Sequence, residues 1–383
     1  MSQEIVPFRI HVPEDVLTDL RARLARARIP EGMPDAGWSQ GTDPAYLREL
    51  CAYWRDHFDW RAAEARLNQF DQFRTPIDGV DLHFIHVRSR EPGALPLLLS
   101  HGWPGSVMEF YKIIGPLTDP VAHGGSAKDA FHVVCPSLPG YGFSGIPRAP
   151  GLTPRRMGGA FTQLMARLGY TRYGAQGGDW GAIITPHIAD LDPEHVAGIH
   201  LNMVAVLPSQ PPSMDGVLPE ELQGLQAFQR FREEESAYQA IQGTKPQSLG
   251  VALNDSPAGL AAWIVEKFRT WSDCDGHVER RFTKDELLTN ITIYWVTQTA
   301  TSAARLYLEG LRSGSFGILD RRLETPTGCA LFPKEILVPP RVWAERAFRV
   351  TRWTKMPRGG HFAALEEPEL LTEDIRAFFR PLR

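Results

Sequence analysis

The sequence contains few cysteines, and their spacing indicates neither a disulfide framework nor a metal site. No Cys-x-x-Cys pair occurs in 383 residues, and the four cysteines are Cys51, Cys135, Cys274 and Cys329. Small secreted domains that depend on disulfides are much richer in cysteine. The pattern therefore favours a reduced, cytoplasmic protein.

Long hydrophobic runs and a strong charge of either sign are also lacking. No apolar run approaches the roughly 20 residues that span a bilayer. Residues 1–7 have neither the basic nor the apolar stretch of a signal peptide. The formal net charge of −4 gives no electrostatic reason to expect nucleic acid or an anionic membrane as a partner. We expect a soluble protein that binds neither.

Motifs for metals, nucleotides and dinucleotides are missing as well. The sequence has no Walker loop and no Gly-rich dinucleotide fingerprint. His83 and His86 form an HxxH pattern on an expected strand, where they point to opposite faces and cannot pair as metal ligands. We therefore expect no metal and no organic cofactor.

The order of strand and helix patterns predicts an α/β fold. Strands are expected at 95–100, 131–136 and 171–176, with helices between them. That alternation is typical of a parallel sheet with crossover helices. Two further strands are expected at 327–332 and 348–353, before a final helix at 368–379.

The remaining segments divide the chain into four parts. Residues 1–93 read as an N-terminal extension, with helices near 13–28, 44–58 and 60–68 and a hairpin turn at Asp78-Gly79. A Pro-rich boundary at 208–219 precedes a helical stretch at 220–312. The predicted division is an extension at 1–93, a first core part at 94–207, a helical lid at 208–314 and a second core part at 315–383.

Gly177-Gly178-Asp179-Trp180-Gly181 is the most informative motif. It has the small-x-nucleophile-x-small pattern of a strand-to-helix elbow, which exposes its central residue above a sheet. An Asp in that position attacks carbon through a carboxylate oxygen and forms an alkyl ester. The simpler interpretation is a Gly-rich turn with an Asp that caps a helix.

Candidates for the other parts of a hydrolase site follow in the expected chain order. His361 lies on a Gly-rich loop after the last strand, where the base of a triad belongs, and Glu335 follows the preceding strand as the orienting acid. The N–H groups of Trp103 and Trp180 are candidates for an oxyanion hole. Taken singly, Glu335 also reads as a surface residue at a turn, and the loop of Trp103 as an ordinary turn between a strand and a helix.

Together these motifs resemble the epoxide hydrolases of the α/β-hydrolase fold, of the microsomal type, which carry an N-terminal extension. The resemblance runs nearly from end to end of the chain. It rests on Pro7-Phe8 with Leu17, Leu20 and Leu24, and on Trp103-Pro104-Gly105, Gly177–Gly181, 253–260, 332–335 and 359–364. Some relatives carry a membrane anchor ahead of this domain; we expect this protein to lack one and to be soluble.

The resemblance implies a mechanism and further site residues. Two lid tyrosines hold the epoxide oxygen in this family; Tyr238 and Tyr307 match them, with Tyr294 as the rival. Asp179 would attack a ring carbon, and His361 with Glu335 would activate a water that cleaves the ester to a vicinal diol. The partner is then a small-molecule epoxide, and a homodimer stays open.

The substrate and two alternative functions also stay open. The lid aromatics Trp263, Phe268, Trp271 and Trp295 favour a bulky or aromatic epoxide, although aromatic residues of a helical lid are more often core. Similar enzymes serve detoxification or secondary metabolism, including enediyne antibiotic biosynthesis. A haloalkane dehalogenase would share the nucleophile but needs halide donors, and a catalytically silent binding protein would lack a triad or tyrosine residue.

Overall fold

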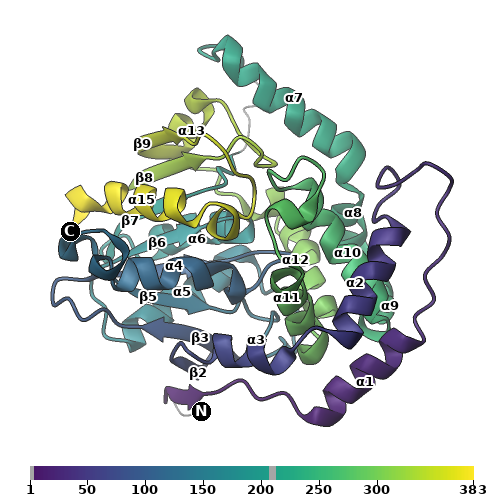
Figure 1. Ribbon diagram of the computed structural model, residues 1–383. Coiled ribbons are helices and arrows are strands. Elements are labelled where there is room, and N and C mark those ends of the chain that lie inside the picture. Colours follow the sequence, from purple (N-terminus) through teal and green to yellow (C-terminus); the bar gives the residue numbers. More distant parts are fainter. Residues whose placement is uncertain (1–3, 207–212) are drawn as a thin grey trace.

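A nine-stranded sheet runs through the centre of the computed structural model, which describes residues 4–206 and 213–383 (Figure 1). The strand order is β1-β2-β3-β5-β4-β6-β7-β8-β9. The first strands pair antiparallel, and the pairs from β5 to β9 are all parallel. The strands are β1 (Val6–Phe8), β2 (Gln72–Ile77), β3 (Val80–Val87), β4 (Leu95–Ser100), β5 (Phe131–Pro136), β6 (Tyr173–Gly177), β7 (Val196–Leu201), β8 (Leu323–Leu331) and β9 (Phe348–Lys355).

Side chains that alternate along the central strands build a hydrophobic core on each face of the sheet. In β4, Leu98 belongs to one core, whereas Leu97 and Leu99 belong to the other. Helices α5 (Pro154–Arg167) and α6 (Trp180–Leu191) pack together over the first face, and α4 (Tyr111–Thr118) and α15 (Pro368–Phe379) over the second. The carboxyl ends of the parallel strands therefore meet at one edge, where such sheets place their sites.

The helical region that begins beyond residue 213 lies at one side of the sheet, and the N-terminal helices lie against it (Figure 1). Its helices are α7 (Leu222–Arg230), α8 (Ala237–Thr244), α9 (Pro246–Asp255), α10 (Pro257–Thr270), α11 (Lys284–Thr297) and α12 (Ala300–Arg312). Contacts to it come from α1 (Glu14–Ala25), α2 (Pro44–Asp56) and α3 (Trp60–Leu67). Arg23 pairs with Asp255 at 2.7 Å, and the Tyr53 hydroxyl donates to Asp285 at 2.9 Å. The remaining helices are α13 (Arg341–Ala347) and α14 (Ala363–Glu366).

The sequence-based elements agree closely with this fold. The α/β-hydrolase class is confirmed, and β4, β5 and α15 have the predicted bounds. The expected hairpin is β2–β3, with positive φ at both Asp78 (51°) and Gly79 (77°), as a type I′ turn requires. Strand β8 begins four residues before the predicted 327, because its first part pairs with β9 across a register shift.

The N-terminal hairpin and the Pro-rich boundary differ from the other predicted elements in how they relate to the structure. The hairpin of the N-terminal extension joins the central sheet, since β3 pairs with β5. Of the predicted Pro-rich boundary at 208–219, residues 208–212 lie outside the described residues. Among the helices in 4–206 and 213–383, none has the length and apolar character needed to traverse a bilayer.

Two buried histidines join the strands to neighbouring loops and are held neutral. The His83 ring bonds Ser137 and Gln72 at 2.9 Å each. Leu138 N–H donates to Nε2 of His101, so the proton lies on Nδ1, which donates to Gly102 O at 3.0 Å. Burial lowers the pKa of His83 to about 3 and that of His101 to about 4.

Because both pKa values fall below the ordinary 6.5, the unfolded chain binds protons more readily than the folded protein. Stability from these histidines should be complete above pH 6.5 and should fall as the pH drops toward 4. At pH 5 each should cost about 2 kcal/mol of unfolding free energy relative to pH 7. Urea unfolding at both values tests this, and His83→Gln should flatten the dependence. Equal stability at pH 7 and pH 5 would contradict it.

Candidate active site

Asp179 lies in a strained turn between β6 and α6. Its backbone has φ 50° and ψ −128°, a conformation that non-glycine residues rarely adopt and that is costly unless the surroundings enforce it. The glycines of the motif are needed for close packing. A Cβ at Gly177 would lie 2.2 Å from the oxygen of Gly181, and one at Gly181 would lie 1.9 Å from the oxygen of Ser100. The turn therefore holds the Asp179 side chain at the carboxyl edge of the sheet.

A backbone donor binds one oxygen of the Asp179 carboxylate. Trp103 N–H donates to Oδ1 at 2.8 Å. The loop after β4 supplies this donor, and a Cβ at Gly102 would lie 2.0 Å from the same oxygen. Trp180 is the first residue of α6, whose N-terminal N–H groups and dipole favour a negative charge at Asp179.

His361 and Glu335 complete a chain of contacts with the second oxygen. His361 Nε2 lies 3.2 Å from Asp179 Oδ2, and His361 Nδ1 lies 2.6 Å from Glu335 Oε1. Glu335 follows β8, and His361 lies between β9 and α14, as the chain order predicts. Burial by itself lowers the pKa of His361, but the charge of Glu335 and the bonds to Asp179 and Glu335 outweigh it, so the pKa lies well above its ordinary value.

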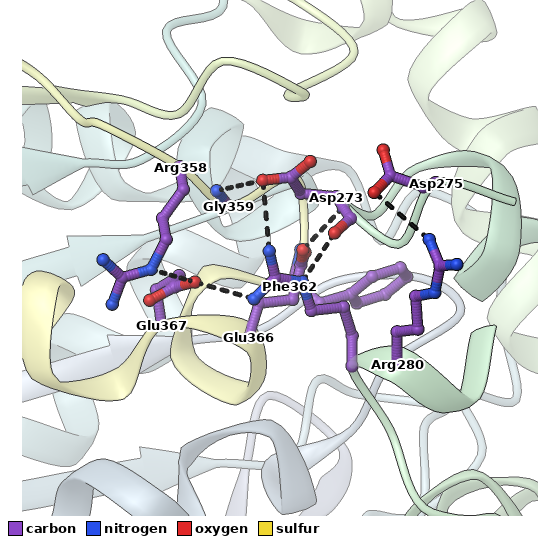
Figure 2. A network of polar contacts seen from close by, with 9 residues as sticks. Asp273, Asp275, Arg280, Arg358, Gly359, Phe362, Glu366 and Glu367 are labelled. Atoms are coloured by element: carbon purple, nitrogen blue, oxygen red, sulfur yellow. Dashed lines mark hydrogen bonds and ion pairs between the residues drawn. The ribbon is translucent and has the colours of Figure 1, made fainter. Parts of the chain in front are cut away.

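A network of polar contacts ties the His361 loop to the end of the helical region, at 271–273. His361 N–H donates to the oxygen of Trp271, and Gly359 N–H to Asp273 Oδ2, both at 2.9 Å. The Glu366 carboxylate accepts from the N–H of Phe362 at 2.9 Å and from the N–H of Asp273 at 2.8 Å (Figure 2).

Basic residues fix the outer side of the same loop. Glu367 accepts from Arg358 at 2.8 Å and from Arg281 at 2.9 Å (Figure 2). Arg281 also lies 3.3 Å from the Asp273 carboxylate. The position of the imidazole thus depends on residues from two distant parts of the chain.

Two tyrosines of the helical region converge on the two tryptophans beside Asp179. Tyr238 stacks on Trp103 with ring centroids 5.0 Å apart, and Tyr307 lies edge-on to Trp180 at 4.9 Å. The two tyrosine rings lie 5.7 Å from each other. Burial raises the pKa of both hydroxyls above the ordinary value for tyrosine, so both stay protonated at neutral pH.

Tyr294, the rival candidate, has another partner. Its hydroxyl donates to the oxygen of Gly105 at 2.7 Å, and Asn290 Nδ2 donates to the oxygen of Pro104 at 2.8 Å. Both residues lie on α11 and hold the loop after β4 in place. The structure therefore brings together Asp179, His361, Glu335, Tyr238, Tyr307, Trp103 and Trp180, whose catalytic roles stay predictions.

Of the four lid aromatics named from the sequence, Trp271 is the one whose ring contacts rings of these residues. Its ring lies 5.1 Å from that of His361 and 5.2 Å from that of Tyr238. Phe268 instead stacks on Phe362 at 4.0 Å as core packing. No sequence motif links Trp271 to His361, because 90 positions separate them.

A five-residue π-helical segment, Phe231–Glu235, precedes Tyr238 and was not predicted. Such segments shift the register of the following turn and often occur at functional sites. Lys267 lies 4.8 Å above the Tyr238 ring and pairs with Glu266 at 2.5 Å.

Within 4–206 and 213–383, no group of three or more His, Cys, Asp or Glu side chains is placed to hold a metal ion.

The arrangement of sheet, elbow and triad defines an α/β hydrolase, and comparison with known proteins gives the family. Residues 5–110 match the model described as epoxide hydrolase N terminus, and residues 96–304 match the alpha/beta hydrolase fold. A Stigmatella aurantiaca homologue is 49% identical over 99% of this chain and 86% of its own. Rabbit (Oryctolagus cuniculus) Epoxide hydrolase 1 is 41% identical over 98% of this chain and 89% of its own length.

A solved structure agrees with these matches. Juvenile hormone epoxide hydrolase from the silkworm Bombyx mori superposes with a TM-score of 0.92 at 33% identity, covering 100% of this chain and 95% of that one. The chain belongs to the epoxide hydrolase family, as its motifs predicted, and it is an enzyme.

Removal of the Glu366 carboxylate should loosen the His361 loop. In Glu366→Ala, two buried N–H groups lose their acceptor, which should lower the unfolding free energy by about 2 to 4 kcal/mol. Turnover should fall by about tenfold because the imidazole is less well placed. Urea unfolding and steady-state kinetics measure the two effects. Glu369→Ala, an exposed change nearby on α15, should alter neither, and wild-type stability of Glu366→Ala would contradict the role of this network.

Proposed function

We propose that this enzyme opens an epoxide to a vicinal diol through a covalent alkyl ester of Asp179. The observation that carries the proposal is the position of the Asp179 carboxylate. One of its oxygens is bound by Trp103 N–H, and the other faces His361. The rings of Tyr238 and Tyr307 pack on Trp103 and Trp180, the two residues that flank this carboxylate. A bound carboxylate oxygen with two phenol donors nearby suits attack on a strained ring carbon.

In the first step, Asp179 Oδ2 attacks a ring carbon, and the bond from that carbon to the epoxide oxygen breaks. Tyr238 and Tyr307 hydrogen-bond the oxygen and supply the proton that the alkoxide takes. Their buried, protonated hydroxyls are suited to this task, because a phenol donates to an alkoxide yet stays neutral at pH 7.

In the second step, His361 takes a proton from a water whose oxygen attacks the carbonyl carbon of the ester. Ester formation removes the Asp179 charge, and with it one of the two carboxylates that keep the pKa of His361 high. The imidazolium then gives up its proton, which restores the phenol of the tyrosine that supplied one in the first step, and His361 becomes a free base still oriented by Glu335. The N–H groups of Trp103 and Trp180 stabilise the oxyanion, a contact worth several kcal/mol.

A bulky or aromatic epoxide is the proposed substrate class. The rings of Trp103, Trp180 and Trp271 surround the two tyrosines and offer apolar, flat contact surfaces. Detoxification and secondary-metabolite biosynthesis are both compatible with such a substrate. We place the enzyme in the cytoplasm because its four cysteines are free and buried.

A single turnover on styrene oxide in oxygen-18 water tests the proposal. The first diol should carry no label, because its new oxygen comes from Asp179, and the label should appear in the peptide that contains Asp179. Mass spectrometry of diol and peptide measures both. Label that enters the first diol directly contradicts the ester. Halide release from a bromoalkane without epoxide opening would instead indicate a dehalogenase.

Loss of either proposed oxygen donor should slow the first step. Tyr238→Phe and Tyr307→Phe keep the ring and its packing, and each should slow alkylation of Asp179 by about a hundredfold. The double variant should be nearly inactive, because an unassisted alkoxide leaves poorly. Rapid-quench mass spectrometry follows the adduct.

Tyr294→Phe is the matched control, because that hydroxyl bonds the protein backbone. We expect it to alkylate within about threefold of the wild type, at a cost of about 1 to 2 kcal/mol in stability. A wild-type alkylation rate in Tyr238→Phe or Tyr307→Phe would make that tyrosine a packing residue.

A further inference from the structure

Glu109 places a carboxyl group on the segment that follows Trp103, whose N–H binds Asp179, and the mechanism above does not use it. It lies in the short 3₁₀ helix η1 (Val107–Phe110), four residues after Gly105. A Cβ at Gly105 would lie 1.4 Å from Glu109 Oε1, so the carboxyl occupies the space that any other residue would fill at this position. The carbonyl of Gly105 is itself fixed by the Tyr294 hydroxyl. The loop is thus built to place this carboxyl.

The charges that face Glu109 are those of the triad. In order of strength they are His361, Asp179 and Glu335. Burial, opposed by His361 and reinforced by the two carboxylates, raises the pKa of Glu109 to about 8, so the group is mostly neutral at pH 7. It therefore adds no second full charge beside Asp179 before the reaction.

Glu109 also has free hydrogen-bonding capacity. Across 4–206 and 213–383, the structure gives its carboxyl no protein hydrogen-bond partner. It is half-buried although Val107, Met108 and Phe110 are buried, and the Asp179 side chain likewise keeps 13% of its surface accessible. Buried polar groups without a protein partner are normally satisfied by ordered water. The carboxyl is therefore suited to hold a water molecule on the side from which the charges of His361 and Asp179 act on it.

Ester cleavage requires such a water in a defined orientation. One of its hydrogens must point to His361 Nε2, and a lone pair must face the carbonyl carbon of Asp179. His361 binds only the first hydrogen, which leaves the water free to rotate. An acceptor for the second hydrogen would fix its orientation.

We propose that Glu109 is this acceptor, a positioning residue that holds the hydrolytic water during cleavage of the Asp179 ester. The carbonyl oxygen of Glu109 accepts the second hydrogen, and His361 takes the first as a proton. The water oxygen bonds to the carbonyl carbon, and the bond from that carbon to the substrate oxygen breaks. The product alkoxide then recovers the proton from His361. The inference rests on the proposed function and concerns its second step alone.

Two substitutions with side chains of similar length distinguish the hydrogen-bonding role of Glu109 from its packing role. Glu109→Gln keeps an oxygen acceptor, whereas Glu109→Met fills the same space without a strong one. With styrene oxide, rapid-quench mass spectrometry gives the rates of ester formation and ester decay for each variant. His361→Gln provides the reference for blocked decay, and thermal unfolding checks the fold.

We expect Glu109→Met to slow ester decay by at least about tenfold, the effect of one lost hydrogen bond. The rate of ester formation should stay within about threefold of the wild-type rate, so the ester accumulates. The values of kcat and KM should then fall together, and kcat/KM should be unchanged. In Glu109→Gln, the rate of ester decay should stay within about threefold of the wild-type rate.

Three results would overturn the inference. They are wild-type ester decay in Glu109→Met, an equal loss of ester formation and decay in that variant, and a Glu109→Gln variant as slow as Glu109→Met. The second would assign Glu109 to the support of the Gly105 loop. A wild-type enzyme that makes no diol would contradict the proposed function, whereas wild-type turnover with an unimpaired Glu109→Met would contradict this inference alone.

Discussion

The carboxylate of Asp179 is the constraint around which the site is organised. The close approach of Gly177 and Gly181 to neighbouring backbone keeps the strained backbone of Asp179, with φ 50°, in place. Trp103 N–H at 2.8 Å and His361 at 3.2 Å hold its carboxylate. An exposed aspartate on a flexible loop would lose orientation and would be solvated. The fold therefore stores local strain at Asp179, and the large core on each face of the sheet offsets its cost.

The helical region and the sheet depend on each other through the His361 loop. Trp271 accepts the N–H of His361 and packs against its ring, and Glu366 joins Phe362 to Asp273. The same region carries Tyr238 and Tyr307, so the proposed base and the proposed proton donors share one support. The N-terminal helices add ion pairs such as Arg23 with Asp255 on the outer side. A shift of this region relative to the sheet would disturb both chemical steps at once.

Motifs carried by the local chain were predictable from sequence, and contacts between distant segments were not. The elbow at Asp179, the bounds of β4 and β5 and the turn at Asp78-Gly79 follow from glycine chemistry and hydrophobic patterning, which act over a few residues. Chain order also placed Glu335 and His361. The contact of Trp271 with His361 and the π-helical segment before Tyr238 depend on tertiary packing, to which a single sequence gives no access. Tyr294 shows the same limit, because its helical position resembles that of a donor and its hydroxyl bonds Gly105.

The charge of the site explains how one histidine would serve both steps of the proposed mechanism. Before the reaction, Asp179 and Glu335 flank His361 and keep its pKa well above the ordinary value, so the imidazole is a poor base while Asp179 acts as nucleophile. In the proposed mechanism, ester formation neutralises Asp179, the support for the proton weakens, and His361 becomes a base when a water must be activated. A neutral Glu109 suits this sequence of events, because a third carboxylate beside the imidazole would keep it protonated after the ester has formed. The order of the two steps is thus set by the change in charge at Asp179 itself.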